Sequence, residues 1–316
     1  MKILYFNVTF RCNQDCWFCA ARLDPRAQIP LQVMKSTLRR FGVGPGDYVI
    51  INGGEATLHR GLEGLVREIR RCGARSNLYT NGALLADMAR TRRLALAGLD
   101  FICIPFYGRT AREHDAMTRR RGTFAMTCAG IDNLTLLKAE GYPITIELKL
   151  LHCRPTYRQN PSIACWMAQR FPGIDFISLN PPLYTGRARD HWRRFAVNLF
   201  KTKQWLNEAA AAVLKSGVNL SVPHIPYCLL RERLRDDRCR KTFLPYPLLG
   251  PILYFDPAHP SGVIHTRSLP SLKPCRACRY YRRCPGFNPY NLGTVNSTWT
   301  PSAGSNPASP TIPPEP

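Results

Sequence analysis

The sequence lacks the features that would place it in a membrane or outside the cell. No uninterrupted apolar run in its 316 residues approaches the roughly 18 residues of a membrane span. The apolar start, Met1 to Phe6, is short, is followed by Asn7, and has no small-residue cleavage site, so we expect no signal peptide. Phe10 and Arg11 precede the first cysteine, which argues against a lipoprotein anchor. We therefore expect a cytoplasmic protein with no membrane partner.

Acidic residues are also scarce. The chain has 44 Lys and Arg against 21 Asp and Glu, which gives a formal net charge of +23. Such a charge permits attraction to acidic peptides, nucleic acids or anionic surfaces. The arginines are spread along the chain and do not form one basic block with interleaved aromatic residues, so nucleic-acid binding is not specifically indicated. We interpret the charge as a solvated, arginine-rich surface and do not expect a nucleic-acid partner.

Disulfide bonds are not expected in a reducing compartment, yet the chain has 13 cysteines. Clustered cysteines in such a protein indicate metal ligands, whereas scattered ones behave as small buried hydrophobic residues. We assign the second role to Cys72, Cys103, Cys128, Cys153 and Cys165.

The first cysteine cluster lies in residues 11–20, directly after an apolar run at residues 3–10. Cys12, Cys16 and Cys19 have the spacing C-x3-C-x2-C. Three thiolates on one loop can bind three irons of a [4Fe–4S] cube, whereas structural zinc and a closed cubane take four protein ligands. The missing fourth ligand leaves one iron open, which indicates a reacting metal. The alternative is three chance cysteines, or half of a zinc site.

Residues 1 to about 180 alternate short strand patterns with helical patterns. Six strands, each followed by a helical stretch, predict an α/β fold with a parallel sheet and right-handed crossovers. A closed barrel needs eight such units in about 250 residues, so we expect a partial, open (β/α)6 barrel. The expected strands are residues 3–10, 48–52, 77–80, 101–106, 144–151 and 176–180, and the expected helices are 31–41, 62–72, 84–97, 124–140 and 162–171.

Sites in such folds gather at the carboxyl ends of the strands. The cysteines follow the first expected strand, Gly53-Gly54-Glu55 follows the second, and Asn81 lies in the turn after the third. Glycine lets a ligand approach the backbone closely. Glu147 and Asn180 are weaker candidates for the same cavity, and an ion pair with Lys149 or an arginine is the alternative role of Glu147.

These motifs resemble the signature of the radical S-adenosylmethionine (SAM) superfamily. The resemblance rests on the cysteine spacing, on the aromatic Phe18 directly before the third cysteine, and on Gly-Gly-Glu one βα unit later. It implies that the three cysteines bind a [4Fe–4S] cluster whose open iron is chelated by the amino and carboxylate groups of SAM. The SAM-binding residues that it implies are Phe18, Gly53, Gly54, Glu55 and Asn81.

A second cysteine cluster lies near the end of the chain. Cys275, Cys278 and Cys284 have the spacing C-x2-C-x5-C, which is similar to the core of the SPASM and twitch domains that follow radical SAM barrels. The resemblance implies a second, auxiliary [4Fe–4S] cluster with a fourth ligand upstream, for which Cys228 and Cys239 compete. A zinc ribbon-like structural site is the alternative.

These assignments predict four segments. Residues 1–189 form the radical SAM core barrel, 190–217 a connecting helix, 218–290 a small α+β auxiliary-cluster domain, and 291–316, rich in Ser, Thr, Asn and Pro, a disordered tail. Within the auxiliary domain we expect a strand at residues 220–226 and a hairpin of 251–255 with 263–266.

The resemblance implies an enzyme that cleaves SAM reductively to a 5′-deoxyadenosyl radical and takes hydrogen from a substrate, with an electron donor such as flavodoxin or ferredoxin. Because of the auxiliary cysteines and a loop around His114-Asp115, the leading hypothesis is modification of a peptide or protein. The same chemistry on a small molecule, in cofactor or natural-product biosynthesis, is the alternative. A non-catalytic iron–sulfur or zinc protein that binds nucleic acid is a third hypothesis. No catalytic residue is assigned; Tyr107, Tyr184, Cys153 and Cys165 are candidates only by their chemistry.

Overall fold

The computed structural model describes residues 1–231, 234, 252–257, 259–265 and 284. Its strands are β1 (Ile3–Thr9), β2 (Tyr48–Gly53), β3 (Arg75–Tyr79), β4 (Phe101–Phe106), β5 (Thr145–Leu151), β6 (Phe176–Asn180), β7 (Asn219–Ser221), β8 (Ile252–Asp256) and β9 (His259–His265). Its α-helices are α1 (Leu31–Arg40), α2 (Leu62–Arg71), α3 (Met88–Ala97), α4 (Ala111–Thr118), α5 (Thr123–Ala139), α6 (Asn160–Arg170), α7 (Gly186–Asp190) and α8 (Lys203–Lys215). Short 3-10 helices are η1 (Ala56–Leu58), η2 (Ala83–Ala86), η3 (Trp192–Arg194) and η4 (Tyr227–Leu229).

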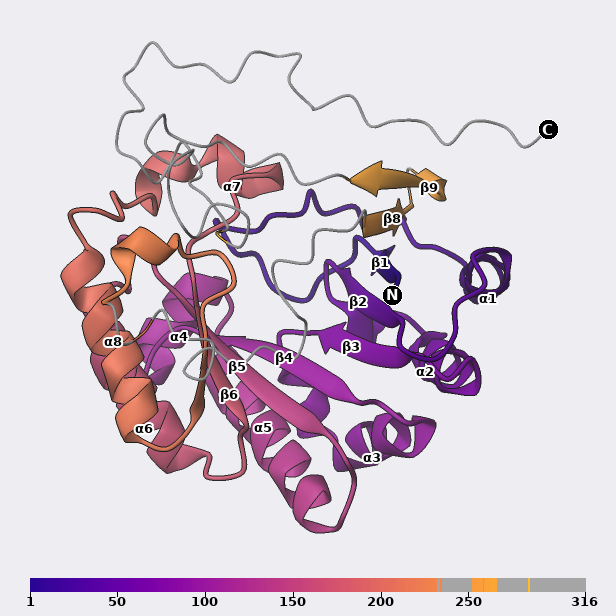
Figure 1. Ribbon diagram of the computed structural model, residues 1–316, viewed down its shortest axis with the longest axis horizontal. Helices are drawn as coiled ribbons and strands as arrows, with labels where there is room; N and C mark the ends of the chain where they lie inside the picture. Colours follow the sequence, from indigo (N-terminus) through magenta and orange to yellow (C-terminus); the bar gives the residue numbers. More distant parts are fainter. Residues whose placement is uncertain (232–233, 235–251, 258, 266–283, 285–316) are drawn as a thin grey trace.

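All nine of these strands belong to one sheet, in the order β7-β6-β5-β4-β3-β2-β1-β8-β9. The strands from β7 to β8 run parallel, and β9 returns antiparallel to β8. Parallel neighbours need crossover connections, and the helices that supply them lie along the outer side of the sheet (Figure 1). The described sheet begins at β7 and ends at β9, so it is open, and the predicted partial α/β barrel is confirmed.

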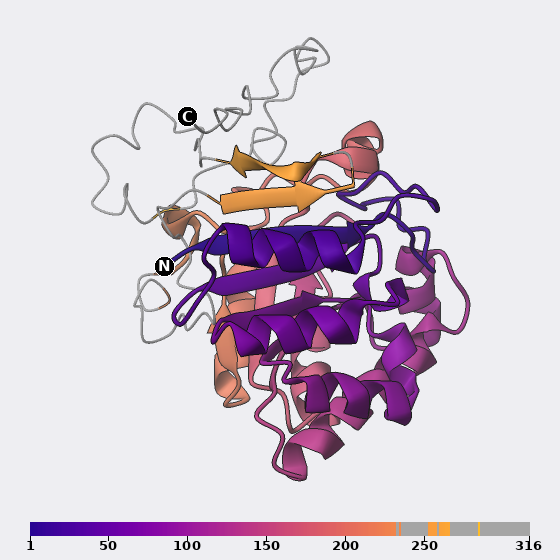
Figure 2. The same cartoon turned by 90° about the vertical axis from the view of Figure 1, so that its right-hand side faces the viewer.

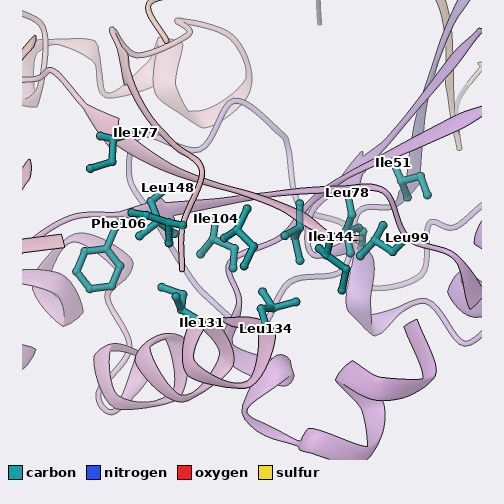
Figure 3. Packing of buried hydrophobic residues seen from close by; sticks show 14 of the residues in the cluster. Ile51, Leu78, Leu99, Ile104, Phe106, Ile131, Leu134, Ile144, Leu148 and Ile177 are labelled. Atoms are coloured by element: carbon teal, nitrogen blue, oxygen red, sulfur yellow. The ribbon is translucent and has the colours of Figure 1, made fainter. Parts of the chain in front are cut away.

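The core lies between the sheet and the helices. On β5 the residues Ile146, Leu148 and Leu150 are fully buried, and they alternate with less buried residues that point to the other face. Figure 3 shows such side chains of neighbouring strands packed against Ile131 and Leu134 of α5. This alternation fixes the register of β5, because a shift by one residue would turn its apolar side chains away from the helices.

Two helix predictions need correction. The helix expected at residues 84–97 begins only at Met88, because the carboxylate of Asp87 accepts a hydrogen bond from the N–H of Arg90 and caps α3 there, after the separate η2 turn. The single helix expected at 190–217 is instead broken into α7, η3 and α8. Phe195, Ala196 and Val197 lie in the break and are all buried, which one face of a helix cannot achieve for three successive residues.

The expected strand at residues 220–226 is found at Asn219–Ser221, where it extends the barrel sheet as β7 beside β6. The expected hairpin is confirmed as β8 and β9, with β8 parallel to β1 at the other edge. Residues 239, 275, 278 and 291–316 lie outside the described residues, and the division of the chain into domains stays a prediction. No helix in the described part of the chain is long and apolar enough to cross a membrane.

Candidate functional site

The candidate site is built on the loop of residues 11–20, which we call the cysteine loop. It follows β1 at the carboxyl ends of the parallel strands (Figure 2). The turn after β2 is bonded to it, since the N–H of Gly54 donates to the carbonyl of Thr9 at 2.7 Å and the N–H of Glu55 donates to that of Arg11 at 2.7 Å. A Cβ on Gly54 would lie 2.2 Å from the Arg11 oxygen. The two predicted motifs therefore meet directly, backbone against backbone, and Gly54 makes this approach possible.

The three cysteines lie together on this loop, and each is half-buried. The N–H of Cys19 donates to the carbonyl of Cys16 at 3.4 Å, and the N–H of Gln14 donates to the Cys12 sulfur at 3.4 Å. Burial raises the pKa of the Cys12 thiol to about 12 and also raises the pKa of Cys16 and of Cys19. Backbone N–H groups and the charge of Arg187 partly oppose these shifts, and a metal cation at the loop would further favour the thiolates that metal binding requires.

This donor set fits an iron–sulfur cluster. Three thiols from one loop are the ligand type that such clusters take. Among the described residues, no group of three or more His, Cys, Asp or Glu side chains is arranged around a single metal ion. A [4Fe–4S] cluster does not require three ligands around one metal ion, because each cysteine binds a different iron.

Glu55 is buried in the centre of the site, with 1% of its surface exposed. Its Oε1 accepts hydrogen bonds from the N–H and hydroxyl of Thr57 and from the hydroxyl of Thr80, at 3.0, 2.5 and 2.6 Å. Its Oε2 accepts one from the N–H of Asn81 at 2.7 Å. The carboxylate therefore joins the turns after β2 and β3, a role that the sequence did not predict. Oε2 accepts one hydrogen bond, so one of its lone pairs can accept from a further donor.

We expect Glu55→Gln to destabilise the fold by about 1.5–3 kcal/mol, because hydrogen bonds to a charged acceptor are lost and the new amide N–H₂ faces the backbone N–H of Asn81 or of Thr57, which can only donate. Urea unfolding of the purified apoprotein measures this change. Glu63→Gln, at a half-buried position in the first turn of α2, is the matched control and should change the stability by less than about 1 kcal/mol. Equal unfolding midpoints for Glu55→Gln and the wild type would contradict the role of this carboxylate.

Asn81 and Phe18 also lie at the site. The side-chain N–H₂ of Asn81 donates to Oδ1 of Asn13 on the cysteine loop at 2.7 Å. The ring of Phe18 lies 5.0 Å from that of Tyr107 and 6.4 Å from that of Phe195, measured between centroids. Both predicted residues are thus in place beside the cysteines, although their role toward SAM stays a prediction.

Tyr107 lies next to the cysteine loop. Burial raises its pKa well above the ordinary value, and negative charge on Cys16, Cys19 or Cys153 would raise it further. A cavity of about 370 Å³ opens beside it, with largely apolar walls that include Trp17, Phe18, Tyr107, Met117, Thr156 and Phe195. No sequence pattern predicts this cavity, because its walls come from four segments far apart in the chain.

Two candidates on the inner face of the sheet are held by neighbouring strands. Oε1 of Glu147 accepts from the hydroxyl of Ser178 at 2.5 Å and from the thiol of Cys103 at 3.5 Å. Burial raises the pKa of Glu147, and the bond from Ser178 partly opposes this shift. Asn180 donates to the Ser178 hydroxyl at 3.0 Å, and its own Oδ1 is buried without a hydrogen-bond partner among the described residues. The charge of Lys149 also favours the Glu147 carboxylate, but no ion pair within 4 Å joins them in the described chain.

His114 and Asp115, from the loop that supported the peptide hypothesis, have structural roles here. Asp115 accepts hydrogen bonds from the N–H groups of Gly122 and Phe124 and so organises the start of α5. His114 is buried against Phe106 and Tyr107, and burial lowers its pKa to about 4. The helix α4 that carries both residues was not predicted, although Thr110 and Glu113 form a capping box that marks its start.

The other cysteine and tyrosine candidates are dispersed. Cys153 and Tyr184 are buried in a small apolar cluster beside Phe18, and Cys165 is exposed on α6. Cys228 is exposed in η4, and Cys284 is half-buried. Cys239, Cys275 and Cys278 lie outside the described residues, so the second cluster stays a prediction.

An aromatic ring on the cysteine loop is held between two cations, which the sequence did not predict. The guanidinium carbons of Arg119 and Arg194 lie 4.2 and 4.1 Å from the centroid of the Trp17 ring. Arg119 also pairs with Asp15 at 2.9 Å, and Arg187 donates a short hydrogen bond to the same carboxylate. The hydrogen bond from Arg187 lowers the pKa of Asp15, so this side chain is ionised over the physiological range.

Comparison with known proteins matches residues 6–148 to the Radical SAM superfamily. The chain is 32% identical over 129 residues to a GTP 3′,8-cyclase of Peptoclostridium acidaminophilum, which covers 38% of each chain. It is 34% identical over 113 residues to a probable GTP 3′,8-cyclase of Saccharolobus solfataricus, which covers 34% of this chain and 35% of that protein. The chain thus spans well under half of the length of these relatives.

Two solved structures share the fold. SuiB of Streptococcus suis, bound to S-adenosylmethionine, superposes with a TM-score of 0.62 at 13% identity, over 92% of this chain and 73% of that one. The structure of anSMEcpe with bound AdoMet and Cp18Cys peptide superposes with a TM-score of 0.61 at 14% identity, over 90% and 89%. Together these findings support the radical SAM superfamily and indicate an enzyme.

Proposed function

We propose that this chain is a radical SAM enzyme that holds a [4Fe–4S] cluster on Cys12, Cys16 and Cys19 and acts on a small molecule of cofactor or natural-product biosynthesis. The observation that carries the proposal is the direct bonding of the Gly53–Glu55 turn to the cysteine loop at the carboxyl ends of the strands. The cluster and SAM, when bound, supply one-electron cleavage of the C5′–S bond and hydrogen-atom abstraction from the substrate.

The chain's own residues prepare this chemistry. Glu55 fixes the turn of Asn81 against the cysteine loop, so that backbone and amide groups converge beside the cysteines. Phe18 and Tyr107 form an apolar wall next to them. A wall of this kind keeps water away from a reactive radical.

The relatives support this choice of substrate class. The identities of 32–34% are to proteins named as GTP 3′,8-cyclases, which favours a small molecule, and a nucleotide is the first to test. Peptide modification remains the second candidate, because a precursor could be bound by the segment that contains Cys275, Cys278 and Cys284. That segment, with Cys228 or Cys239, would hold an auxiliary cluster in our proposed division into a barrel (1–189), a connector (190–217), an auxiliary domain (218–290) and a tail (291–316).

The test is anaerobic reconstitution with iron and sulfide, followed by dithionite and SAM with GTP or a peptide as substrate. We expect 5′-deoxyadenosine to form, and its yield to rise with GTP. An iron content of about eight per chain supports two [4Fe–4S] clusters, and about four supports the barrel cluster alone. A fully loaded protein that never cleaves SAM would overturn the proposal, and stimulation by a peptide alone would favour the second candidate.

A further inference from the structure

The outer surface around the cysteine loop carries an excess of positive charge. Arg119, Arg120 and Arg193 are exposed, and Arg194 is exposed beside the Trp17 ring. Asp15 is the carboxylate of the cysteine loop, and it is already engaged by two arginines. In the described chain, Arg120 and Arg193 form no ion pair within 4 Å, and the charge of Arg120 acts on Asp15 only at longer range.

These arginines are far apart in the sequence, and the fold brings them together. The backbone N–H of Asp15 donates to the carbonyl of Thr118 at 3.0 Å, which brings the end of α4 onto the cysteine loop. The N–H of Ala188 donates to the carbonyl of Cys19 at 2.8 Å, which brings α7 and the segment of Arg193 to the same loop. Two segments that are more than 60 residues apart therefore place their arginines around one point on the cysteine loop.

That point is Trp17, which directly follows the proposed cluster ligand Cys16. The Trp17 ring is only partly buried, and it lies between the guanidinium groups of Arg119 and Arg194. Both cation–π contacts are attractive, so they hold the ring and the two arginines together. A partner that docks on these arginines is brought to the outer edge of the cluster site.

We propose that this surface, formed by Trp17 and the arginines at 119, 120, 193 and 194, is the docking site of an acidic one-electron donor protein. The inference rests on the proposed function, because the cluster must be reduced before SAM is cleaved. Electron transfer weakens steeply with distance, so the donor has to approach the cysteine loop itself. The net charge of +23 attracts an acidic protein from a distance, and the local arginines select this face.

The experiment uses the double variant Arg120→Glu/Arg193→Glu in the full chain. Neither side chain is in the proposed cluster or SAM site. The control is Arg67→Glu/Arg75→Glu, which changes the net charge equally but lies on α2 and at the opposite end of β3, where both side chains are exposed. SAM cleavage is measured with reduced flavodoxin and, in parallel, with dithionite, at low and physiological ionic strength.

With flavodoxin we expect kcat/KM of the test variant to fall about tenfold or more at low salt, and the control to stay within about twofold of the wild type. The difference in kcat/KM between the test and control variants should narrow at physiological ionic strength, because the Debye length shortens from about 30 to about 8 Å. With dithionite both variants should match the wild type.

An equal fall in test and control variants, no fall with flavodoxin, or a fall that appears equally with dithionite would each overturn the docking site. So would weaker binding of the substrate with unchanged donor kinetics, because the surface would then serve an acidic substrate. A wild type that fails with dithionite as well would instead refute the proposed function, so the two failures can be told apart.

Discussion

Cys16→Ala is expected to lose SAM cleavage. The cysteine loop supplies three thiol ligands, and the missing sulfur would leave one more iron without a protein ligand. We expect the yield of 5′-deoxyadenosine to fall at least about 100-fold. Mutation of a group that only hydrogen-bonds to a metal ligand already lowers metal affinity or activity about 10–100-fold, and Cys16 is itself a proposed ligand. The measurement is the 5′-deoxyadenosine released under dithionite, together with the iron content per chain.

Cys165→Ala is the matched control for this prediction. Cys165 is exposed on α6, outside the cysteine loop, so its loss should leave the iron content and the rate of SAM cleavage unchanged. If Cys16→Ala bound as much iron as the wild type and cleaved SAM at a similar rate, the loop would not be the cluster site. If both variants lost iron equally, the effect would reflect cysteine loss in general.

The strand at residues 101–106 was predicted, with the bounds that are found, as a short apolar run, and it is buried on both faces. The strand at 144–151 was predicted with an error of one residue, and it alternates in sequence. Its residues Ile146, Leu148 and Leu150 face the helices and the residues between them do not, so this pattern of burial is already present in the chain. The same reasoning failed at residues 195–199, because that segment is buried by distant elements and not by its own periodicity.

The site could be predicted only as far as its ligands are close in sequence. Cys12, Cys16 and Cys19 are on one loop, and the Gly53–Glu55 turn follows the neighbouring parallel strand, so spacing and topology bring them together. The partners of Glu55 come from two different turns, and a carboxylate in a glycine turn gives no hint of them.

The contacts of Trp17 could not be predicted for the same reason. Its two arginines lie 102 and 177 positions farther along the chain, and they reach it only because α4 and η3 both pack on the cysteine loop. The composition shows the excess of arginine but not where the fold concentrates it. Long-range polar and cationic contacts at a loop therefore need the structure, whereas a strand with a clear alternation does not.

Gly54→Ala is expected to damage the site, because the turn has no room for the added methyl group. The new Cβ would lie 2.2 Å from the carbonyl oxygen of Arg11 and 2.8 Å from its carbonyl carbon. Both atoms belong to the backbone of the cysteine loop, so no side chain can move aside. The loop has to shift, and the hydrogen bond from the N–H of Glu55 to Arg11 has to lengthen or break.

We expect this variant to lose about 1–3 kcal/mol of stability and most of its bound iron, because overpacking forces the backbone to move at the ligands themselves. Urea unfolding of the apoprotein and the iron content after reconstitution measure the two effects. Gly44→Ala is the control: its Cβ would meet its nearest neighbour, the carbonyl oxygen of Cys72, at an ordinary 3.9 Å, so both values should stay close to those of the wild type. Full iron loading in a folded Gly54→Ala would mean that the cysteines hold the cluster without support from the Gly-Gly-Glu turn, and the contact between the two motifs would then serve the binding of SAM alone.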